Sequence, residues 1–107
     1  MQWLEFKFKG PVCPKRVSIT FQGGFAARKC AASLYKDSKS LDAFLQLKPM
    51  FPIDSNEAQS FALLTEQDEF ASGQKLRLAF SESADFYGRV VVYEVHIWGT
   101  GARSADV

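Results

Sequence analysis

The chain lacks the compositional marks of several classes of protein. Its 107 residues include 13 basic and 12 acidic side chains, which gives a formal net charge of +1. A surface that follows a phosphate backbone or an anionic membrane is visibly basic, so nucleic acid and membrane are poor candidates for partners. No apolar run approaches the roughly 20 residues of a membrane span. Apolar and polar residues alternate from the N-terminus onward, and this pattern does not resemble a secretory signal. We therefore expect an intracellular protein, nuclear or cytoplasmic.

Cysteine and histidine are also scarce. Cys13 and Cys30 are too few for a disulfide framework, and reduced, buried thiols are the favoured interpretation. The basic residues Arg28 and Lys29 precede Cys30 and could lower its pKa to make it a nucleophile, but a structural thiol is favoured. His96 is the single histidine and suits an exposed strand position better than a general base. We expect no cofactor, no metal ligand and no enzyme.

What the chain does have is alternation of apolar and polar residues. Leu4, Phe6 and Phe8 share one face of the segment 3–9, while charged residues occupy the other. The same period of two recurs in the segments 17–21, 75–80 and 90–98, and it is typical of half-buried strands. The pattern predicts an all-β, antiparallel domain over residues 1–99, followed by a flexible tail over 100–107.

The connections are predicted from proline and glycine. Gly10 to Pro14 is expected to link two strands, because a proline cannot donate to a sheet ladder. Gly23 and Gly24 end the second strand in a loop that needs glycine torsions. A turn is expected over Gln67 to Gly73, with Gly73 free to take a positive φ.

The middle of the chain leaves alternatives open. Short strands are expected at 30–35 and 60–64, and Ile53 to Glu57 is expected to be a loop. Between Ser40 and Leu47 the apolar spacing fits one short helix with Ser40 as its N-cap, but a strand over 44–47 fits nearly as well.

The turn Asp85-Phe86-Tyr87-Gly88 joins two predicted strands at an end where loops carry recognition. Its aromatic side chains either plug the core or form a stacking platform for a ligand, and the core is favoured. Phe25 has the same two interpretations. The candidate binding residues lie in this turn and in the Gly-Gly loop: Gln22, Gly23, Gly24, Phe25, Asp85, Phe86, Tyr87, Gly88 and Arg89.

Three blocks of the chain are considered together: Gln2 to Phe6, Phe21-Gln-Gly-Gly-Phe25 and Asp85 to Tyr93. They resemble a family of nuclear-receptor-associated repressors of the testicular orphan receptor four. The resemblance implies a galactose-binding-like, discoidin-type jelly-roll β-sandwich that binds a nuclear receptor or joins a larger complex.

Family members carry a further segment before the strand that matches Gln2 to Phe8, and this chain starts at that strand. No metal ligand is therefore carried over from the resemblance. We expect an open sheet edge, which would lead the protein to self-associate or to be stable mainly within a complex.

Three functions remain. The leading one is a non-catalytic protein-interaction module, by resemblance a transcriptional co-regulator. The alternative is a sandwich that binds a carbohydrate or another small ligand through Phe25, Phe86 and Tyr87. The third is an OB-like binder of single-stranded nucleic acid, which the balanced charge disfavours.

Overall fold

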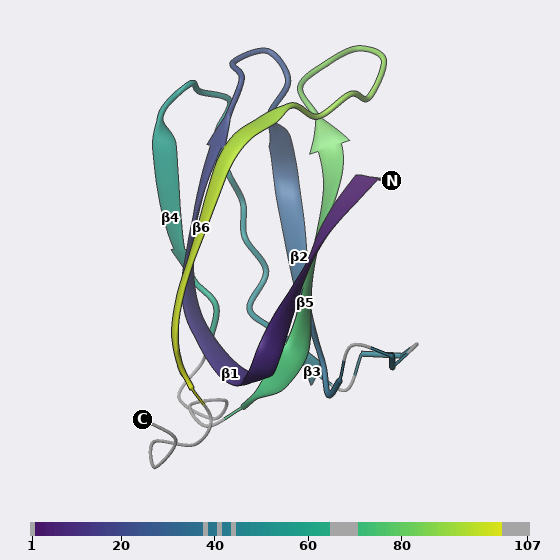
Figure 1. The fold of residues 1–107 in the computed structure, drawn as a ribbon. Coiled ribbons are helices and arrows are strands. Elements are labelled where there is room, and N and C mark those ends of the chain that lie inside the picture. Colours follow the sequence, from purple (N-terminus) through teal and green to yellow (C-terminus); the bar gives the residue numbers. More distant parts are fainter. Residues whose placement is uncertain (1, 38, 41, 44, 65–70, 102–107) are drawn as a thin grey trace.

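The fold is built from strands, as the alternation predicts. The structure is a computed structural model, and it describes residues 2–37, 39–40, 42–43, 45–64 and 71–101. Figure 1 shows the six strands, which are β1 (Gln2–Phe21), β2 (Ala27–Tyr35), β3 (Leu45–Gln46), β4 (Ala58–Ala62), β5 (Gly73–Ser83) and β6 (Val92–Gly101). The described residues contain no helix, and so none long and apolar enough to cross a membrane.

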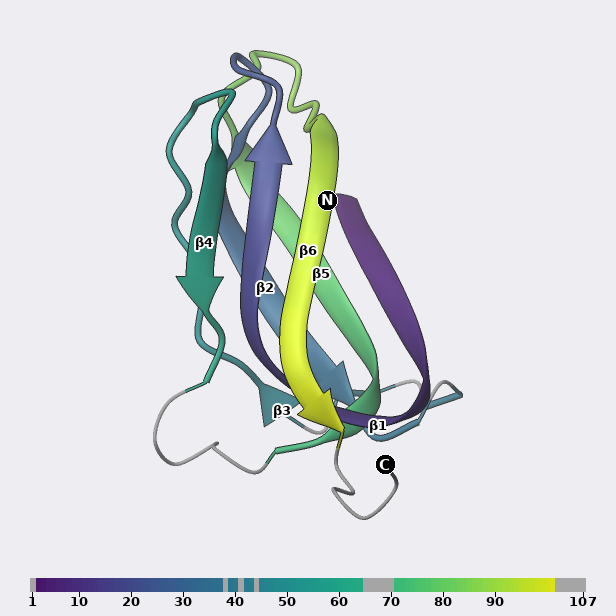
Figure 2. The same cartoon turned by 60° about the vertical axis from the view of Figure 1, so that its left-hand side comes forward.

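All six strands belong to one curled antiparallel sheet, in the order β3-β2-β5-β1-β4, with β6 also paired to β1. The strand β1 makes the curl because it changes neighbours along its length. Its first half (residues 2–9) pairs with β5 through residues 2–7. Its second half (residues 12–21) pairs with β6 on one side and, over residues 16–20, with β4 on the other. Figures 1 and 2 show the two halves on opposite walls of the molecule, joined by a bend at the base.

The predicted connection from Gly10 to Pro14 is wrong, because these residues are part of β1. The ladder is irregular there: the register shifts between Lys7 and Val12 and again between Pro14 and Arg16. A proline is tolerated where a bulge already removes a regular hydrogen bond. The prolines therefore accompany a bend in the strand and do not end it.

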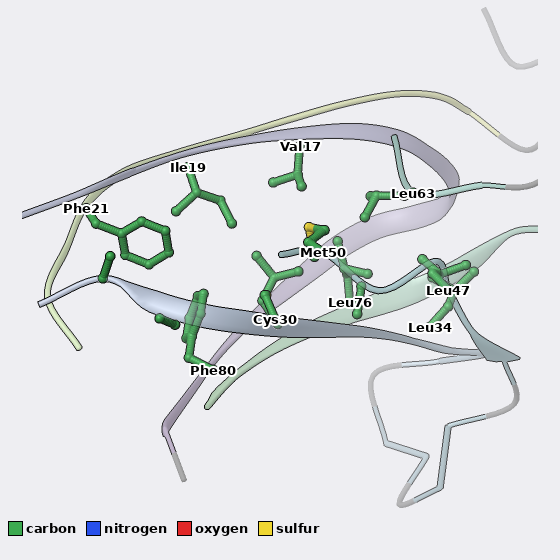
Figure 3. Close-up of a cluster of buried hydrophobic side chains, with 14 residues drawn as sticks. Val17, Ile19, Phe21, Cys30, Leu34, Leu47, Met50, Leu63, Leu76 and Phe80 are labelled. Atoms are coloured by element: carbon green, nitrogen blue, oxygen red, sulfur yellow. The ribbon is translucent and has the colours of Figure 1, made fainter. Parts of the chain in front are cut away.

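The core lies between the two walls and is filled by the apolar face of each strand. Figure 3 shows Phe21 and Phe80 from opposite walls, with ring centroids 5.9 Å apart and an interplanar angle of 84°. Burying an aliphatic or aromatic side chain of this kind stabilises the fold by about 1.5–3 kcal/mol. The alternation predicted the inward positions of β1 and β5. The largest fully buried side chains are Pro14, Val17, Ile19, Phe21, Cys30, Leu34, Met50, Leu63, Leu76 and Leu78.

The segment from Ser40 to Leu47 forms no helix in its described residues, and its strand is β3, of two residues. Its residues Leu41 and Phe44 lie outside the described part. A single helix of two turns is marginal without packing. Pairing with β2 stabilises the segment more than such a helix would, because Leu45 lies opposite Leu34 and the Leu47 N–H donates to the Ala32 carbonyl at 2.9 Å.

Other boundaries shift by a few residues. The strand β4 begins at Ala58, two residues before its predicted start. In the predicted turn, residues 67–70 lie outside the described part, and Gly73 has no positive φ. It begins β5, in a place where an added Cβ would lie 2.3 Å from the Tyr35 carbonyl oxygen. At the other end, Thr100 and Gly101 still belong to β6 and pair with β1, and the rest of the predicted tail lies outside the described residues.

Candidate interaction site

The candidate residues lie in two loops at one end of the sheet, at the top of Figure 1. The loop that follows β1 contains Gln22 to Phe25, and the loop between β5 and β6 contains Asp85 to Arg89. Backbone hydrogen bonds join the two loops. The Gln22 N–H donates to the Val91 carbonyl and the Val91 N–H donates to the Phe25 carbonyl, each at 3.0 Å. Residues more than 60 positions apart in sequence thus form one continuous surface.

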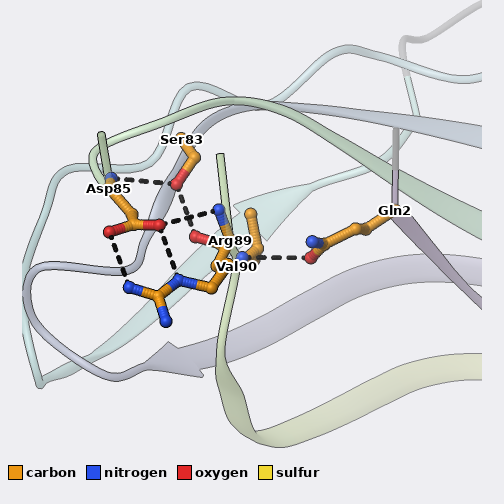
Figure 4. Close-up of polar contacts among 5 residues, drawn as sticks. All are labelled: Gln2, Ser83, Asp85, Arg89 and Val90. Carbon is orange, nitrogen blue, oxygen red and sulfur yellow. Dashed lines mark hydrogen bonds and ion pairs between the residues drawn. The ribbon is translucent and has the colours of Figure 1, made fainter. Parts of the chain in front are cut away.

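An ion pair clamps the second loop. Arg89 donates to the Asp85 carboxylate from its backbone N–H at 3.0 Å and from Nε at 2.9 Å (Figure 4). These side-chain hydrogen bonds hold the pKa of Asp85 below its usual value. The Ser83 hydroxyl donates to the Arg89 carbonyl at 2.5 Å and accepts from the Asp85 N–H at 3.0 Å. The loop is therefore ordered by its own polar groups.

The Arg89 guanidinium also connects the two loops through aromatic rings. Its Cζ lies 5.2 Å from the ring centroid of Phe25 and 5.6 Å from that of Tyr87. Both distances are within the range of a cation–π contact. Phe25 is half-buried beneath this contact. The arrangement fixes one cation between two aromatic side chains at the surface.

Phe86 and Tyr87 point into solvent, with 92% and 78% of their surface exposed. The favoured prediction that they plug the core is wrong. Their rings contact each other edge to face, with centroids 5.2 Å apart. The turn is held outward because the Gly88 N–H donates to the Asp85 carbonyl at 3.0 Å and Gly88 adopts a positive φ of 80°. Below it, Phe21 and Phe80 already fill the core.

A third loop, which sequence reasoning did not include in the site, supports the glycine loop. The Gly23 N–H donates to Asn56 Oδ1 at 2.6 Å, and the Gly24 N–H donates to Asp54 Oδ1 at 2.8 Å. Gly24 has the positive φ that was predicted for this loop, at 90°. Asx side chains often accept backbone N–H groups in loops, which is a weak signal in the sequence. The spacing of 30 or more residues hid this pairing. Ile53, in the same loop, is exposed.

The reactive side chains weighed in the sequence, Cys30 and His96, lie among the described residues. No group of three or more His, Cys, Asp or Glu side chains in this described part of the chain could hold a metal ion. Burial raises the pKa of the Cys30 thiol to about 12, so the hypothesis of a nucleophilic Cys30 is wrong. His96 lies exposed on the outer face of β6, between Glu94 and Trp98, as expected for a strand histidine. The loop end instead offers aromatic surface and one fixed guanidinium.

These features define an antiparallel β protein whose loop end exposes aromatic side chains. No family model matches the chain. Curated relatives do, under one name, nuclear receptor 2C2-associated protein. The Mus musculus protein is 31% identical over 101 residues, which is 94% of this chain and 66% of the relative. The Xenopus laevis and Danio rerio proteins are each 33% identical over 92% of this chain.

The chain is therefore a homologue of the nuclear receptor 2C2-associated proteins, and the resemblance inferred from its sequence blocks is confirmed. The name of those relatives states that they associate with a nuclear receptor. This chain spans 64% to 66% of the length of the relatives it matches, slightly less than two thirds.

Proposed function

We propose that this protein is a non-catalytic, nuclear-receptor-associated interaction module that binds its partner through the loop end. The observation that carries the proposal is the exposure of Phe86 and Tyr87 on a turn that the Asp85–Arg89 ion pair holds in place. The name of the relatives supports a partner of the nuclear-receptor class. The proposed setting is the nucleus or the cytoplasm, where the module acts in transcriptional regulation or as a subunit of a larger complex.

The physical basis of the proposal is that exposed aromatic side chains are unfavourable in water. Two adjacent aromatic rings at the surface gain free energy when a partner covers them, and Tyr, Phe and Arg are enriched in the buried centres of protein interfaces. A side chain with two torsions loses little entropy on binding, and the clamped turn has already been ordered. The finer fold assignment, a galactose-binding-like jelly roll of the discoidin type, is part of the proposal. In such folds the ends of the strands carry recognition loops.

The test is binding of purified nuclear receptor 2C2 to the wild type and to a Phe86→Ala, Tyr87→Ala double variant. We expect the double variant to lose about tenfold or more in affinity, as for aromatic residues at the centre of an interface. Phe51→Ala is the control, because Phe51 is 65% exposed and belongs to neither of the two loops. Equal affinity of wild type and double variant would contradict the proposed surface. No binding by the wild type would contradict this partner.

A carbohydrate or another small ligand is the second candidate. It is favoured by the exposed Tyr87 ring beside the Arg89–Asp85 pair, since a saccharide can stack on an aromatic face and bond to adjacent polar groups. A glycan panel read by tyrosine and tryptophan fluorescence tests it. A response that Tyr87→Ala removes would support this candidate, and the absence of any response would exclude the glycans tried.

A further inference from the structure

A groove separates the first half of β1 from β6, and neither Phe86 nor Tyr87 lines it. It has a volume of about 420 Å³. At the base the two strands meet at Val12, which pairs with both Gly73 and Gly101. From there they diverge, as Figure 1 shows, with β6 in yellow and the first half of β1 in purple. The groove is lined by Gln2, Trp3, Leu4, Glu5, Phe6, Phe80, Val90, Val92, Tyr93, Glu94 and Val95.

Each border of the groove is an open sheet edge. Residues 2–7 of β1 pair with β5 alone, and β6 pairs with β1 alone, within the part of the chain that the structure describes. The backbone N–H and C=O groups on the groove side of both strands therefore have no ladder partner there. Such groups favour pairing with another extended chain.

The direction of the two edges selects the direction of that chain. The first half of β1 and β6 both descend from the loop end to the base, as Figure 1 shows. They are therefore parallel to each other, whereas every pairing in the sheet is antiparallel. A single strand that ascends between them would be antiparallel to both borders. It would close the sheet with the pairing that the rest of the molecule uses.

The Gln2 side chain already makes one hydrogen bond of the kind that such a strand would make. The Gln2 side-chain oxygen accepts a hydrogen bond from the Val90 N–H at 3.0 Å, across the upper end of the groove (Figure 4). Because Gln2 lies at the start of β1 and Val90 just before β6, this bond bridges the two borders. An incoming backbone carbonyl could take the place of the glutamine oxygen.

The lining indicates the chemistry of the occupant. Leu4, Phe6 and Val95 contribute apolar surface to its borders, and 37% of the Leu4 surface is exposed. The charged side chains that line it, Glu5 and Glu94, are both carboxylates. Glu5 is already paired with Arg77, so Glu94 carries most of the negative charge that a basic residue would meet. An extended segment would direct alternate side chains inward and outward. Aliphatic residues suit the inward positions and basic residues suit the outward positions.

We propose that the groove binds an extended segment of a partner protein as an added strand, antiparallel to both β6 and the first half of β1, with aliphatic and basic residues in alternation. A second copy of this chain fits less well. Its own edge strands are already paired on one side and could satisfy one border only. A segment free on both sides can satisfy both.

The probe is a nine-residue peptide of alternating lysine and valine with blocked ends, followed by hydrogen exchange and fluorescence anisotropy. We expect the peptide to slow exchange of backbone amides in residues 2–6 and 92–95. A glutamate–valine peptide should bind about tenfold more weakly at low salt, and added salt should narrow the difference. The same lysine–valine peptide with N-methyl groups on its valines should not bind, because it cannot pair on both sides.

Two substitutions sharpen the test. Leu4→Lys places a cation on the border of the groove and should abolish binding of the lysine–valine peptide. Gln2→Ala removes the competing side-chain oxygen and should tighten binding a few-fold. Phe51→Ala is the control for both variants, because Phe51 does not line the groove.

Three results would overturn the proposal: no slowing of exchange at either border, equal binding of the N-methylated peptide, or a dimer of the free protein that protects the same amides. Receptor binding and peptide binding are scored for every variant. Loss of receptor binding on changing Phe86 and Tyr87 bears on the loop end alone, and loss of peptide binding in Leu4→Lys bears on the groove alone.

Discussion

The two halves of β1 have the same alternating pattern but different surroundings. In the second half, Val17, Ile19 and Phe21 have no exposed surface, whereas in the first half Leu4, on the corresponding face, remains exposed. The difference follows from the number of neighbours. The second half lies between β4 and β6, and the first half has β5 on one side only. Alternation therefore decides which face of a strand turns inward, while neighbouring strands decide how completely that face is buried.

The largest expected effect tests this contrast directly. Ile19→Ala should destabilise the protein by about 2–5 kcal/mol, because it leaves a cavity in a core that cannot fully collapse. Leu4→Ala, in the same strand, should cost much less, since part of the leucine is already in water. Urea unfolding of both variants gives the comparison. Similar losses of unfolding free energy would mean that the two halves are equally buried in solution.

A second, smaller effect is expected at the base, where the halves meet. Gly73→Ala places a Cβ 2.3 Å from the Tyr35 carbonyl oxygen and should cost about 1–3 kcal/mol through overpacking. Gly10→Ala is the matched control, because a Cβ there meets nothing within 4 Å. It should be neutral, or stabilising by a fraction of a kcal/mol, through the unfolded state. Thermal unfolding of both variants checks the pair, and a costly Gly10→Ala would show that the bend is tighter than described.

The smallest effect concerns the ion pair that ties the first half of β1 to β5. Arg77 donates to Glu5 from Nε at 2.7 Å, and this hydrogen bond holds the pKa of Glu5 below 4.5. A carboxylate with a lowered folded pKa stabilises the protein above the unfolded pKa, and the stabilisation is lost as the pH falls through the folded pKa. The melting temperature of the wild type should therefore exceed that of Glu5→Gln slightly at pH 7. The gap should close below pH 4.5, and a gap that widens in acid would contradict the assignment.

The local sequence pattern predicted much of this fold. Period-two alternation placed Leu76, Leu78 and Phe80 on the inward face of β5, and the structure confirms it. Local pattern could not show that Pro14 lies within a strand, because a bulge depends on the partner strand and its register.

The loop end shows the same division between local and distant information. The sequence drew attention to Phe86 and Tyr87, but whether such a turn folds inward depends on a clamp and on a core that other segments have already filled. Asp54 and Asn56 support glycines 30 or more residues earlier, and spacing within one loop gives no sign of a partner so distant. The missing information was long-range in each case.

The curl of β1 has a consequence for synthesis. This strand is made before the other described strands, yet its partners β5 and β6 begin 52 and 71 residues after it ends, which corresponds to several seconds at ribosomal rates. During that time the long strand has not yet formed most of its backbone hydrogen bonds to partner strands. Its apolar face is exposed, and its prolines lie only near its middle. We expect the nascent chain, more than the finished protein, to depend on chaperones that shield apolar strands.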